Sequence, residues 1–213
     1  LSSVKSAQPN YIRQVSYTPN DPLLDNQWAI AKTQSELAWD TELGDASIVI
    51  AVIDSGVAWQ HEDLASNIWR NEDEVDDGKD SDDNGYTGDV RGYDFVHFGP
   101  ELLTELEPYL VDGEDYSVED NNPDDFNGHG THVAGITLGE NYGVARDANC
   151  YALRVLDEEG SGRESDTIAA LDWVAKHDVD VINLSLGSPY ASTALEDMCY
   201  YVANQGKLIV AAA

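Results

Sequence analysis

The sequence predicts an α/β protein with a parallel, doubly wound sheet flanked by helices. The first observation is a long β-branched run, Ser47–Val57, with no polar break before its end. The second is a regular alternation of strand and helix patterns from Asn149 onward, which favours a parallel sheet with right-handed crossovers. The third is a hydrophobic content of 42% in 213 residues, which is enough to build a substantial core.

The N-terminal elements follow from local patterns. Residues 32–41 predict a short helix that precedes the first strand. The run Ser47–Val57 predicts a strand buried on both faces, because it is apolar without alternation. It ends in Asp54-Ser55-Gly56, and ligands of open α/β sheets bind beyond the carboxyl ends of the strands. Asp54 is therefore a candidate site residue, with a capping residue of the turn as the plain alternative.

The second half of the chain predicts three strands and two helices. We expect strands over 151–156, 179–184 and 207–213, and helices over 166–177 and 193–205. Ser165 is the expected N-cap of the first helix, Ser192 caps the second helix and Gly206 ends it. Upstream of these elements, residues 98–118 form an acidic insert whose leucine spacing suits a short amphipathic helix.

A histidine flanked by glycines is the second candidate for chemistry. Within Phe126–Gly135, His129 stands between two glycines that permit close backbone approach, and a tightly packed helix is expected from His132. This arrangement would hold an imidazole at the mouth of a cleft. His129 and His132 also have i, i+3 spacing, so a metal pair and two unrelated loop histidines remain alternatives.

Three motifs in order give the chain a resemblance to a known family. Val52–Val57, Asn127–Gly135 and Asn183–Gly187 resemble the motifs of the subtilisin-like serine proteases, the subtilase family. The resemblance runs from about residue 19 to residue 213 and implies the three-layer fold of that family. It also implies that His129 is the general base of an Asp-His-Ser triad and that Asp54 orients and stabilises its imidazole.

The resemblance implies a catalytic domain that is incomplete at its C-terminal end. In the family, a run like Leu208–Ala213 leads into a Gly-Asn pair whose Asn donates to the oxyanion, and the nucleophilic serine follows much later. Loss of that donor alone costs about 10²–10³ in rate, as measured in subtilisin itself. The chain is therefore expected to supply Asp and His only and to be inactive alone. The C-terminal remainder of the domain is then an expected partner.

Two short segments are expected to bind a polypeptide substrate. Gly160-Ser161-Gly162 and Ser185-Leu186-Gly187 match the family segments that flank an extended peptide and add strand-like hydrogen bonds to it. Leu186 would form the floor of an apolar pocket. The adjacent acidic residues 157–159 suggest a preference for basic substrates. The alternative is that residues 160–162 form only a turn.

An acidic loop predicts one structural Ca²⁺. Oxygen side chains at positions 1, 3 and 5 and a glycine at position 6 of Asp80–Tyr86 form the opening of an EF-hand-type loop, although position 12 is Arg91. The loop also resembles an insert of many subtilases. The expected ligands are Asp80, Asp82, Asn84, the Tyr86 carbonyl and Asp89. A solvated acidic turn is the alternative.

Charge and composition exclude several functions. The chain has 41 acidic and 11 basic residues and a formal net charge of −30, which argues against nucleic-acid binding because phosphates attract cationic surfaces. No apolar run is long enough to cross a bilayer, which argues against a membrane protein. We expect a secreted (extracellular) protein whose leader has been removed. Cys150 and Cys199 are too few for a disulfide framework and are expected to be unpaired, mostly buried thiols.

The N-terminal residues resemble the end of a propeptide. Val4–Ile12 is similar to the closing strand of a subtilase propeptide, so residues 1–17 are expected to be a propeptide end or an extended arm. Residues 18–213 are then the N-terminal part of the peptidase domain, and the protein is a zymogen with its own propeptide as a partner. The sequence as a whole predicts a serine endopeptidase. The alternatives are a catalytically inactive subtilase-like binding or inhibitory module, and a metal hydrolase that uses His129 and His132.

Overall fold

The computed structural model describes residues 22–114 and 116–212, so the expected propeptide end over 1–17 lies outside the described residues. Contacts divide the chain into two units, one ending at Leu43 and one beginning at Gly44. The described part of the first unit contains three short helical segments, Leu24–Asn26 (η1), Trp28–Thr33 (α1) and Ser35–Trp39 (α2).

The single helix expected over 32–41 is wrong. Gln34 adopts a left-handed backbone with φ 59°, which ends α1 and begins α2. The hydroxyl of Thr33, the last residue of α1, donates to the Ala29 carbonyl one turn earlier at 2.8 Å. The apolar spacing of this region therefore belongs to two short helices rather than one.

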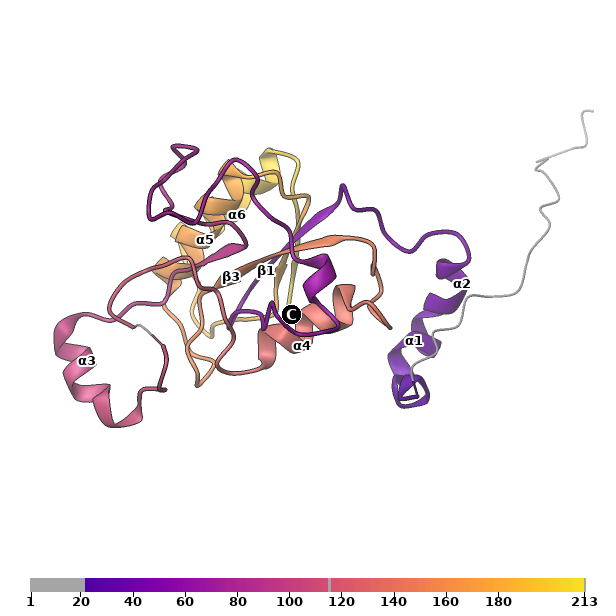
Figure 1. Cartoon of the computed structure of the whole chain (residues 1–213), viewed down its shortest axis with the longest axis horizontal. Helices are drawn as coiled ribbons and strands as arrows, with labels where there is room; N and C mark the ends of the chain where they lie inside the picture. The colour runs from indigo at the N-terminus through magenta and orange to yellow at the C-terminus, as the bar shows by residue number, and fades with distance from the viewer. Residues whose placement is uncertain (1–21, 115, 213) are drawn as a thin grey trace, which may run out of the picture. The chain divides into compact units, whose positions relative to one another are not determined.

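The second unit is built on a parallel sheet of five strands, which confirms the predicted fold class (Figure 1). The spatial order is β2-β3-β1-β4-β5, and every neighbouring pair is parallel. The chain builds β2 and β3 on one side of β1 and later adds β4 and β5 on the other side. The carboxyl end of β1 is thus a topological switch point, where ligands bind in such sheets. The strands are β1 (Val49–Asp54), β2 (Gly92–Asp94), β3 (Asn149–Arg154), β4 (Val181–Leu184) and β5 (Leu208–Ala211).

Helices cover both faces of this sheet (Figure 1). One face carries α4 (His129–Leu138), and the other carries α5 (Glu164–Lys176) and α6 (Thr193–Asn204). Along β1, Ala51 and Ile53 pack with α5 and α6, whereas Ile50 and Val52 pack with α4. Successive side chains of a strand point to opposite faces, so a strand covered on both sides needs an apolar residue at every position. In the described residues, no helix has the length and apolar character that a bilayer crossing requires.

Several element boundaries differ from the sequence prediction. α5 begins at Glu164 with Arg163 at its N-cap, so the assignment of Ser165 as the cap is wrong. Ser165 lies inside the first turn, where its hydroxyl donates to Asp166 at 2.9 Å. α4 begins at His129 rather than at His132. β1, β4 and β5 are shorter than their apolar runs because hydrogen-bonded pairing, and not composition, sets where each one ends. β3 begins and ends two residues earlier than predicted.

Other predicted features are confirmed. The Ser192 hydroxyl caps α6 by accepting from the Leu195 N–H at 3.2 Å. The acidic insert contains α3 (Pro100–Leu106), followed by the short 3₁₀-helix Glu107–Tyr109 (η3). A further 3₁₀ turn, Ala65–Asn67 (η2), follows β1.

The two cysteines are unpaired, as predicted. Cys150 is buried on the α4 side of the sheet, whereas Cys199 of α6 is half-buried against the cluster on the other side. The sheet therefore separates them. Burial raises the pKa of the Cys150 thiol to about 12, which makes it an unreactive packing group.

Candidate active site

The carboxyl ends of the parallel strands lie at one edge of the sheet. Asp54 ends β1 and is in register with Arg154, the last residue of β3. The Asp54 carbonyl accepts backbone hydrogen bonds from Val155 and Leu156 at 2.8 and 3.2 Å. β4 pairs with the other side of β1. Asp54 and the two predicted substrate segments therefore all start from this edge.

Asp54 and His129 are in contact although they are 75 positions apart in the chain. Nδ1 of His129 lies 2.7 Å from Oδ1 of Asp54, and the same oxygen accepts a hydrogen bond from the Ser55 N–H at 2.8 Å. The Asp54 side chain is fully buried, whereas 48% of the His129 side chain is exposed. A buried carboxylate next to Nδ1 holds the proton there, so Nε2 is the ring nitrogen that can accept a proton.

Close backbone packing sets the position of His129 in the first turn of α4. A Cβ atom on Gly130 would overlap the carbonyl oxygen of Gly56 and press against Asp54. The Gly130 N–H instead donates to the Ser55 hydroxyl at 2.9 Å. The start of α4 contacts the turn that follows β1 so closely that only glycine fits at the position after His129.

Asp125 joins these two pieces, although sequence reasoning did not select it. Its carboxylate accepts from the Thr131 N–H and hydroxyl at 2.9 and 2.5 Å, from the Gly128 N–H at 2.8 Å and from the Ser55 hydroxyl at 2.9 Å. Burial raises the pKa of Asp125, but the hydrogen bonds outweigh burial and lower this pKa below its usual value. Asp125 thus serves as the cap that the Gly128 side chain lacks. An Asp shortly before a predicted helix is the signal that points to it.

The predicted substrate segment after β3 begins in a tight turn. The Gly160 N–H donates to the Asp157 carbonyl at 3.0 Å, and the Asp157 N–H donates to the Ser161 carbonyl at 2.7 Å. Gly160 has φ 75°, a left-handed conformation that suits glycine. Ser161 and Gly162 are exposed and lie outside any strand. Residues 160–162 therefore include the turn that is the alternative to a substrate-binding segment, and exposed backbone follows this turn.

Local hydrogen bonds occupy two of the three carboxylates at 157–159. Oδ1 of Asp157 accepts from the Glu159 and Ser161 N–H groups at 3.0 and 2.9 Å. Oε2 of Glu158 accepts from the Tyr116 hydroxyl at 2.7 Å. Only Glu159 of the three is an exposed residue. The expected preference for basic substrates stays a prediction, and it now depends mainly on this one carboxylate.

The second predicted substrate segment follows β4. The Ser185 hydroxyl accepts a hydrogen bond from the Asn183 side chain at 2.9 Å. Leu186 is half-buried and packs against the core cluster beneath α5 and α6, while Gly187 is exposed. The segment is therefore anchored in the core by Leu186 and reaches the surface directly after it.

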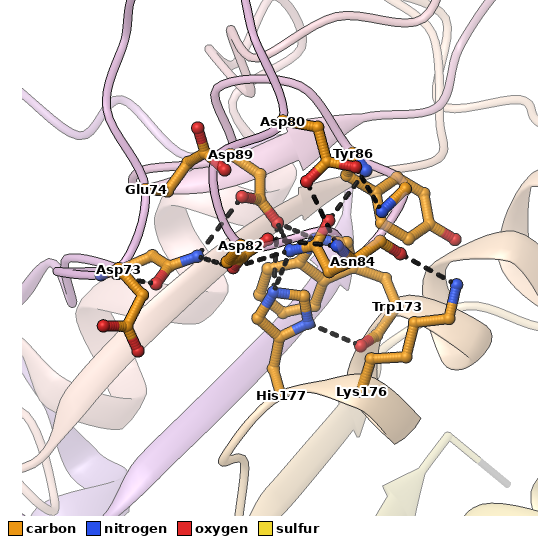
Figure 2. Close-up of polar contacts among 12 residues, drawn as sticks. Asp73, Glu74, Asp80, Asp82, Asn84, Tyr86, Asp89, Trp173, Lys176 and His177 are labelled. Atoms are coloured by element: carbon orange, nitrogen blue, oxygen red, sulfur yellow. Dashed lines mark hydrogen bonds and ion pairs between the residues drawn. The ribbon is translucent and has the colours of Figure 1, made fainter.

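Three of the predicted calcium ligands, Asp80, Asp82 and Asp89, belong to two overlapping groups of possible metal ligands (Figure 2). Potential ligand atoms of Glu74, Asp80 and Asp82 lie within 4.8 Å of one another. Those of Asp82, Asp89 and His177 form a second group with the same limit. Asp82 is common to both groups, so it is the centre of the cluster.

The Asn84 side chain is oriented differently from the expected calcium ligand. The Asn84 side-chain nitrogen donates to Asp82 at 3.0 Å and to Asp89 at 3.1 Å, and its oxygen accepts from the Tyr86 N–H at 2.7 Å. Asn84 thus presents its nitrogen, rather than its oxygen, to the carboxylates (Figure 2). Ca²⁺ prefers oxygen ligands, so the group of Glu74, Asp80 and Asp82 is the one whose chemistry fits this ion.

Glu74 and His177 belong to the cluster but were missed from the sequence. Glu74 is a buried residue whose carboxylate accepts from the Ser81 N–H at 2.9 Å. His177 follows α5, with Nδ1 2.7 Å from the Trp173 carbonyl and Nε2 3.0 Å from Asp89. The Trp173 indole N–H also donates to Asp89, at 2.6 Å. These contacts connect the loop to α5. The local sequence around His177 contains no pattern that predicts them.

Comparison with known proteins agrees with the motifs. The model of the subtilase family matches residues 45–213. The chain is 35% identical to a thermophilic serine proteinase of Bacillus sp. (strain AK1), over 99% of this chain and 44% of that protein. It is 34% identical to the halolysin-like extracellular serine protease Nep of Natrialba magadii (99% and 34% covered) and 31% identical to thermitase of Thermoactinomyces vulgaris (92% and 58% covered). The chain therefore spans 34% to 58% of the length of these relatives.

Two solved structures share the fold with this chain. A cold adapted subtilisin-like serine proteinase matches with a TM-score of 0.56 and 31% identity, over 81% of this chain and 49% of that one. Sphericase matches with a TM-score of 0.57 and 30% identity, over 81% and 47% of the two chains. The family match covers most of the sequence and includes both Asp54 and His129. The chain therefore belongs to the subtilase family.

Proposed function

We propose that this chain is part of a serine endopeptidase and supplies the Asp and the His of its triad. The observation that carries the proposal is the 2.7 Å contact between buried Asp54 and half-exposed His129. His129 takes the proton of the attacking serine hydroxyl and returns it to the leaving amine of the cleaved peptide. Asp54 keeps Nδ1 protonated and stabilises the imidazolium that forms between these two transfers.

The nucleophilic serine and the oxyanion donor belong, in this proposal, to a further part of the protein. The exposure of strand β5 supports it. Leu208 and Val210 are 59% and 49% exposed, although their run has the composition of a buried parallel strand. An apolar strand at the edge of a sheet pairs with, or is covered by, another segment in a stable fold. A C-terminal remainder that packs there would complete both the sheet and the triad.

The proposed substrate is an extended polypeptide. Residues 160–162 and 185–187 follow the two strands that flank β1, so a peptide bound between them would pass Asp54 and His129. Main-chain hydrogen bonds to residues 160–162 on one side, at backbone groups that the turn does not use, and to residues 185–187 on the other side would provide affinity. The half-buried Leu186 supplies an apolar floor for a substrate side chain.

Fluorophosphonate labelling tests this proposal on the full-length protein that carries the sequence. We expect one serine outside residues 1–213 to be labelled, because the probe reacts with a hydroxyl activated by an adjacent base. The His129→Ala variant should lose the label. Intact mass of the same sample establishes whether the serine-bearing segment is present. If it is present and no serine reacts, the enzyme proposal is contradicted and an inactive binding or inhibitory module is favoured.

A metal hydrolase has weaker support. Nδ1 of His129 faces Asp54, and His132 is exposed further along α4. Among the described residues, neither histidine belongs to a group of side chains placed to hold a metal. A catalytic zinc site needs three protein ligands around an open position, and this pair supplies at most two.

We also propose that the acidic loop binds a structural Ca²⁺. Glu74, Asp80 and Asp82 would hold the ion, with Asp89 beside them, and its charge would offset the repulsion between carboxylates that lie within 4.8 Å. Asn84 joins this set only if its amide rotates to present its oxygen, rather than its nitrogen, to the ion. The ion would then tie the loop to α5 through Asp89.

Removal of calcium should lower thermal stability. A site filled at one hundred times its Kd contributes about 2.7 kcal/mol, which corresponds to roughly 5–10 °C in Tm for a domain of this size. We expect EDTA to cause this drop in the wild type, and not in Asp82→Asn, because Asp82 belongs to both ligand groups. Glu101→Gln, at an exposed position of α3, should keep the drop. If calorimetry detects no heat of calcium binding beyond that of a control in buffer with a chelator, the proposed site is contradicted.

Secretion is the proposed location of the protein. The relative Nep carries the word extracellular in its name and is 34% identical over 99% of this chain. The net charge of −30 would keep the surface soluble outside the cell. Fractionation of a culture, with the protein expected in the medium, tests this proposal.

A further inference from the structure

A segment between β2 and the His129 motif is closed on itself, and we call residues 97–119 the insert. Two backbone hydrogen bonds join Asp94 and Asp120 at its base, at 2.8 and 3.1 Å. Just inside them, the Phe98 N–H donates to the Tyr116 carbonyl at 2.7 Å. The rings of Phe98 and Tyr116 stack with their centroids 5.3 Å apart. The two ends of the insert are therefore held together by its own contacts.

A buried ion-pair cluster joins the insert to the end of β3. Nη1 of Arg154 lies 2.6 Å from Asp94 and also contacts Glu114 of the insert. All three side chains are almost completely buried. Arg154 is the register neighbour of Asp54. A charged group of the insert thus reaches the strand position beside the proposed triad aspartate.

The electrostatics of this cluster favour a tightly held arrangement. Burial raises the pKa of Asp94 to about 8 and also raises the pKa of Glu114, although Arg154 acts to lower both. The two carboxyl groups share the single cation of Arg154, and each binds its proton more tightly than a solvated carboxyl group does. The guanidinium also lies over the ring of Tyr116, with its carbon 5.8 Å from the centroid.

Two further links connect the insert to residues on either side of the segment 160–162. Before the segment, the Tyr116 hydroxyl donates to Glu158 at 2.7 Å. After the segment, Nη1 of Arg163 donates to the His97 carbonyl at 2.7 Å, and its guanidinium lies over the Phe98 ring at 5.3 Å. Contacts with the insert therefore hold both flanks of an exposed turn.

We propose that the insert positions residues 157–163 for an extended substrate, with Tyr116 and Glu114 as positioning residues. The inference rests on the proposed function, because that function gives residues 160–162 their role in peptide binding. An exposed turn loses conformational freedom when a peptide pairs with it, and contacts that hold it in place beforehand reduce this cost. Glu114 anchors the insert to the sheet through Arg154. Tyr116 links the insert to the turn through its hydrogen bond to Glu158. Substrates long enough to pair with the turn benefit, and small esters do not.

The test compares a long peptide amide with a small activated ester in the full-length protein. Tyr116→Phe removes only the hydroxyl that Glu158 accepts from. We expect its kcat/KM for the long peptide to fall by roughly tenfold or more, as for the loss of a hydrogen bond to a charged group, mainly through KM. Ester hydrolysis should stay at the wild-type level. Glu114→Gln should show the same split, and Glu105→Gln, at an exposed position of α3, should show no change.

Hydrogen exchange gives a second readout that does not require activity. Amides of residues 157–162 should exchange faster in Tyr116→Phe than in the wild type or in Glu105→Gln. Equal loss on both substrates, or unchanged exchange in Tyr116→Phe, overturns the positioning role. If the wild type hydrolyses neither substrate, the proposed function fails, while the exchange experiment still decides whether the insert holds the turn.

Discussion

Asp54→Asn should lower kcat/KM for peptide hydrolysis by about 10⁴-fold in the full-length protein. Asn places an N–H donor where Nδ1 of His129 now meets a carboxylate oxygen at 2.7 Å. The imidazole would respond by holding its proton on Nε2, where it can no longer accept the proton of a serine. Initial rates on a peptide substrate measure the loss, and circular dichroism establishes that the variant is folded.

His132→Ala is the matched control for Asp54→Asn. His132 lies on the same helix as His129 and is exposed, so an Asp-His-Ser mechanism predicts unchanged activity. A metal mechanism that uses both histidines predicts loss in His132→Ala as severe as in His129→Ala. A fall of less than tenfold in kcat/KM in Asp54→Asn would also contradict the assigned role, because it would mean that the position of the proton on His129 does not depend on Asp54.

Arg154→Met should destabilise the protein by about 3–5 kcal/mol at high pH, the usual cost of removing one partner from a buried ion pair. The variant leaves Asp94 and Glu114 buried without the cation that offsets their charge. Urea unfolding at equilibrium measures the change, in a form of the protein that unfolds reversibly. Arg70→Met replaces an exposed arginine and should cost little.

The destabilisation in Arg154→Met should depend on pH with a definite sign. The folded-state pKa of Asp94 is raised to about 8 and that of Glu114 is also raised, so the folded state binds protons more tightly than the unfolded state. The free energy of unfolding therefore falls as the pH rises towards about 8. Without Arg154 this dependence becomes steeper, because nothing then favours the ionised carboxylates. The defect should be smaller at about pH 5 than at high pH, because protonation of Asp94 and Glu114 removes the charge that Arg154 offsets. An equal loss at about pH 5 and at high pH would contradict the cluster described above.

The proposed catalytic pair could be predicted because each member stands in a short contiguous pattern that resembles a motif of the subtilase family. Asp54 ends an apolar run, and all six residues of β1 are buried, as a strand covered on both faces requires. His129 is followed by a glycine whose absence of a side chain lets α4 touch the turn after β1. Each pattern consists of residues that are contiguous in the chain, so it can be recognised before the fold is known.

The N-cap of α5 and the orientation of the Asn84 amide could not be predicted, because residue type alone does not show where a side chain points. Ser165 has the chemistry of an N-cap, yet α5 begins before it. Asn84 has an oxygen suited to calcium, yet that oxygen accepts from the Tyr86 N–H. The Ser165 hydroxyl donates to the Asp166 side chain, and the Asn84 oxygen accepts from a backbone N–H, so a neighbouring group competes for each polar atom.

By itself, the sequence determined the family, the parallel α/β architecture, the Asp54 and His129 candidates and the acidic loop, since each depends on residues close together in the chain. Only the tertiary structure decided that Asp125 caps α4, that His177 joins the acidic loop and that the insert contacts the turn at 157–163. These contacts join segments whose local patterns are those of ordinary loops and helices. Their geometry depends on sheet register and helix packing, which bring together side chains that are distant in the chain. No short stretch of sequence contains the information that predicts such contacts.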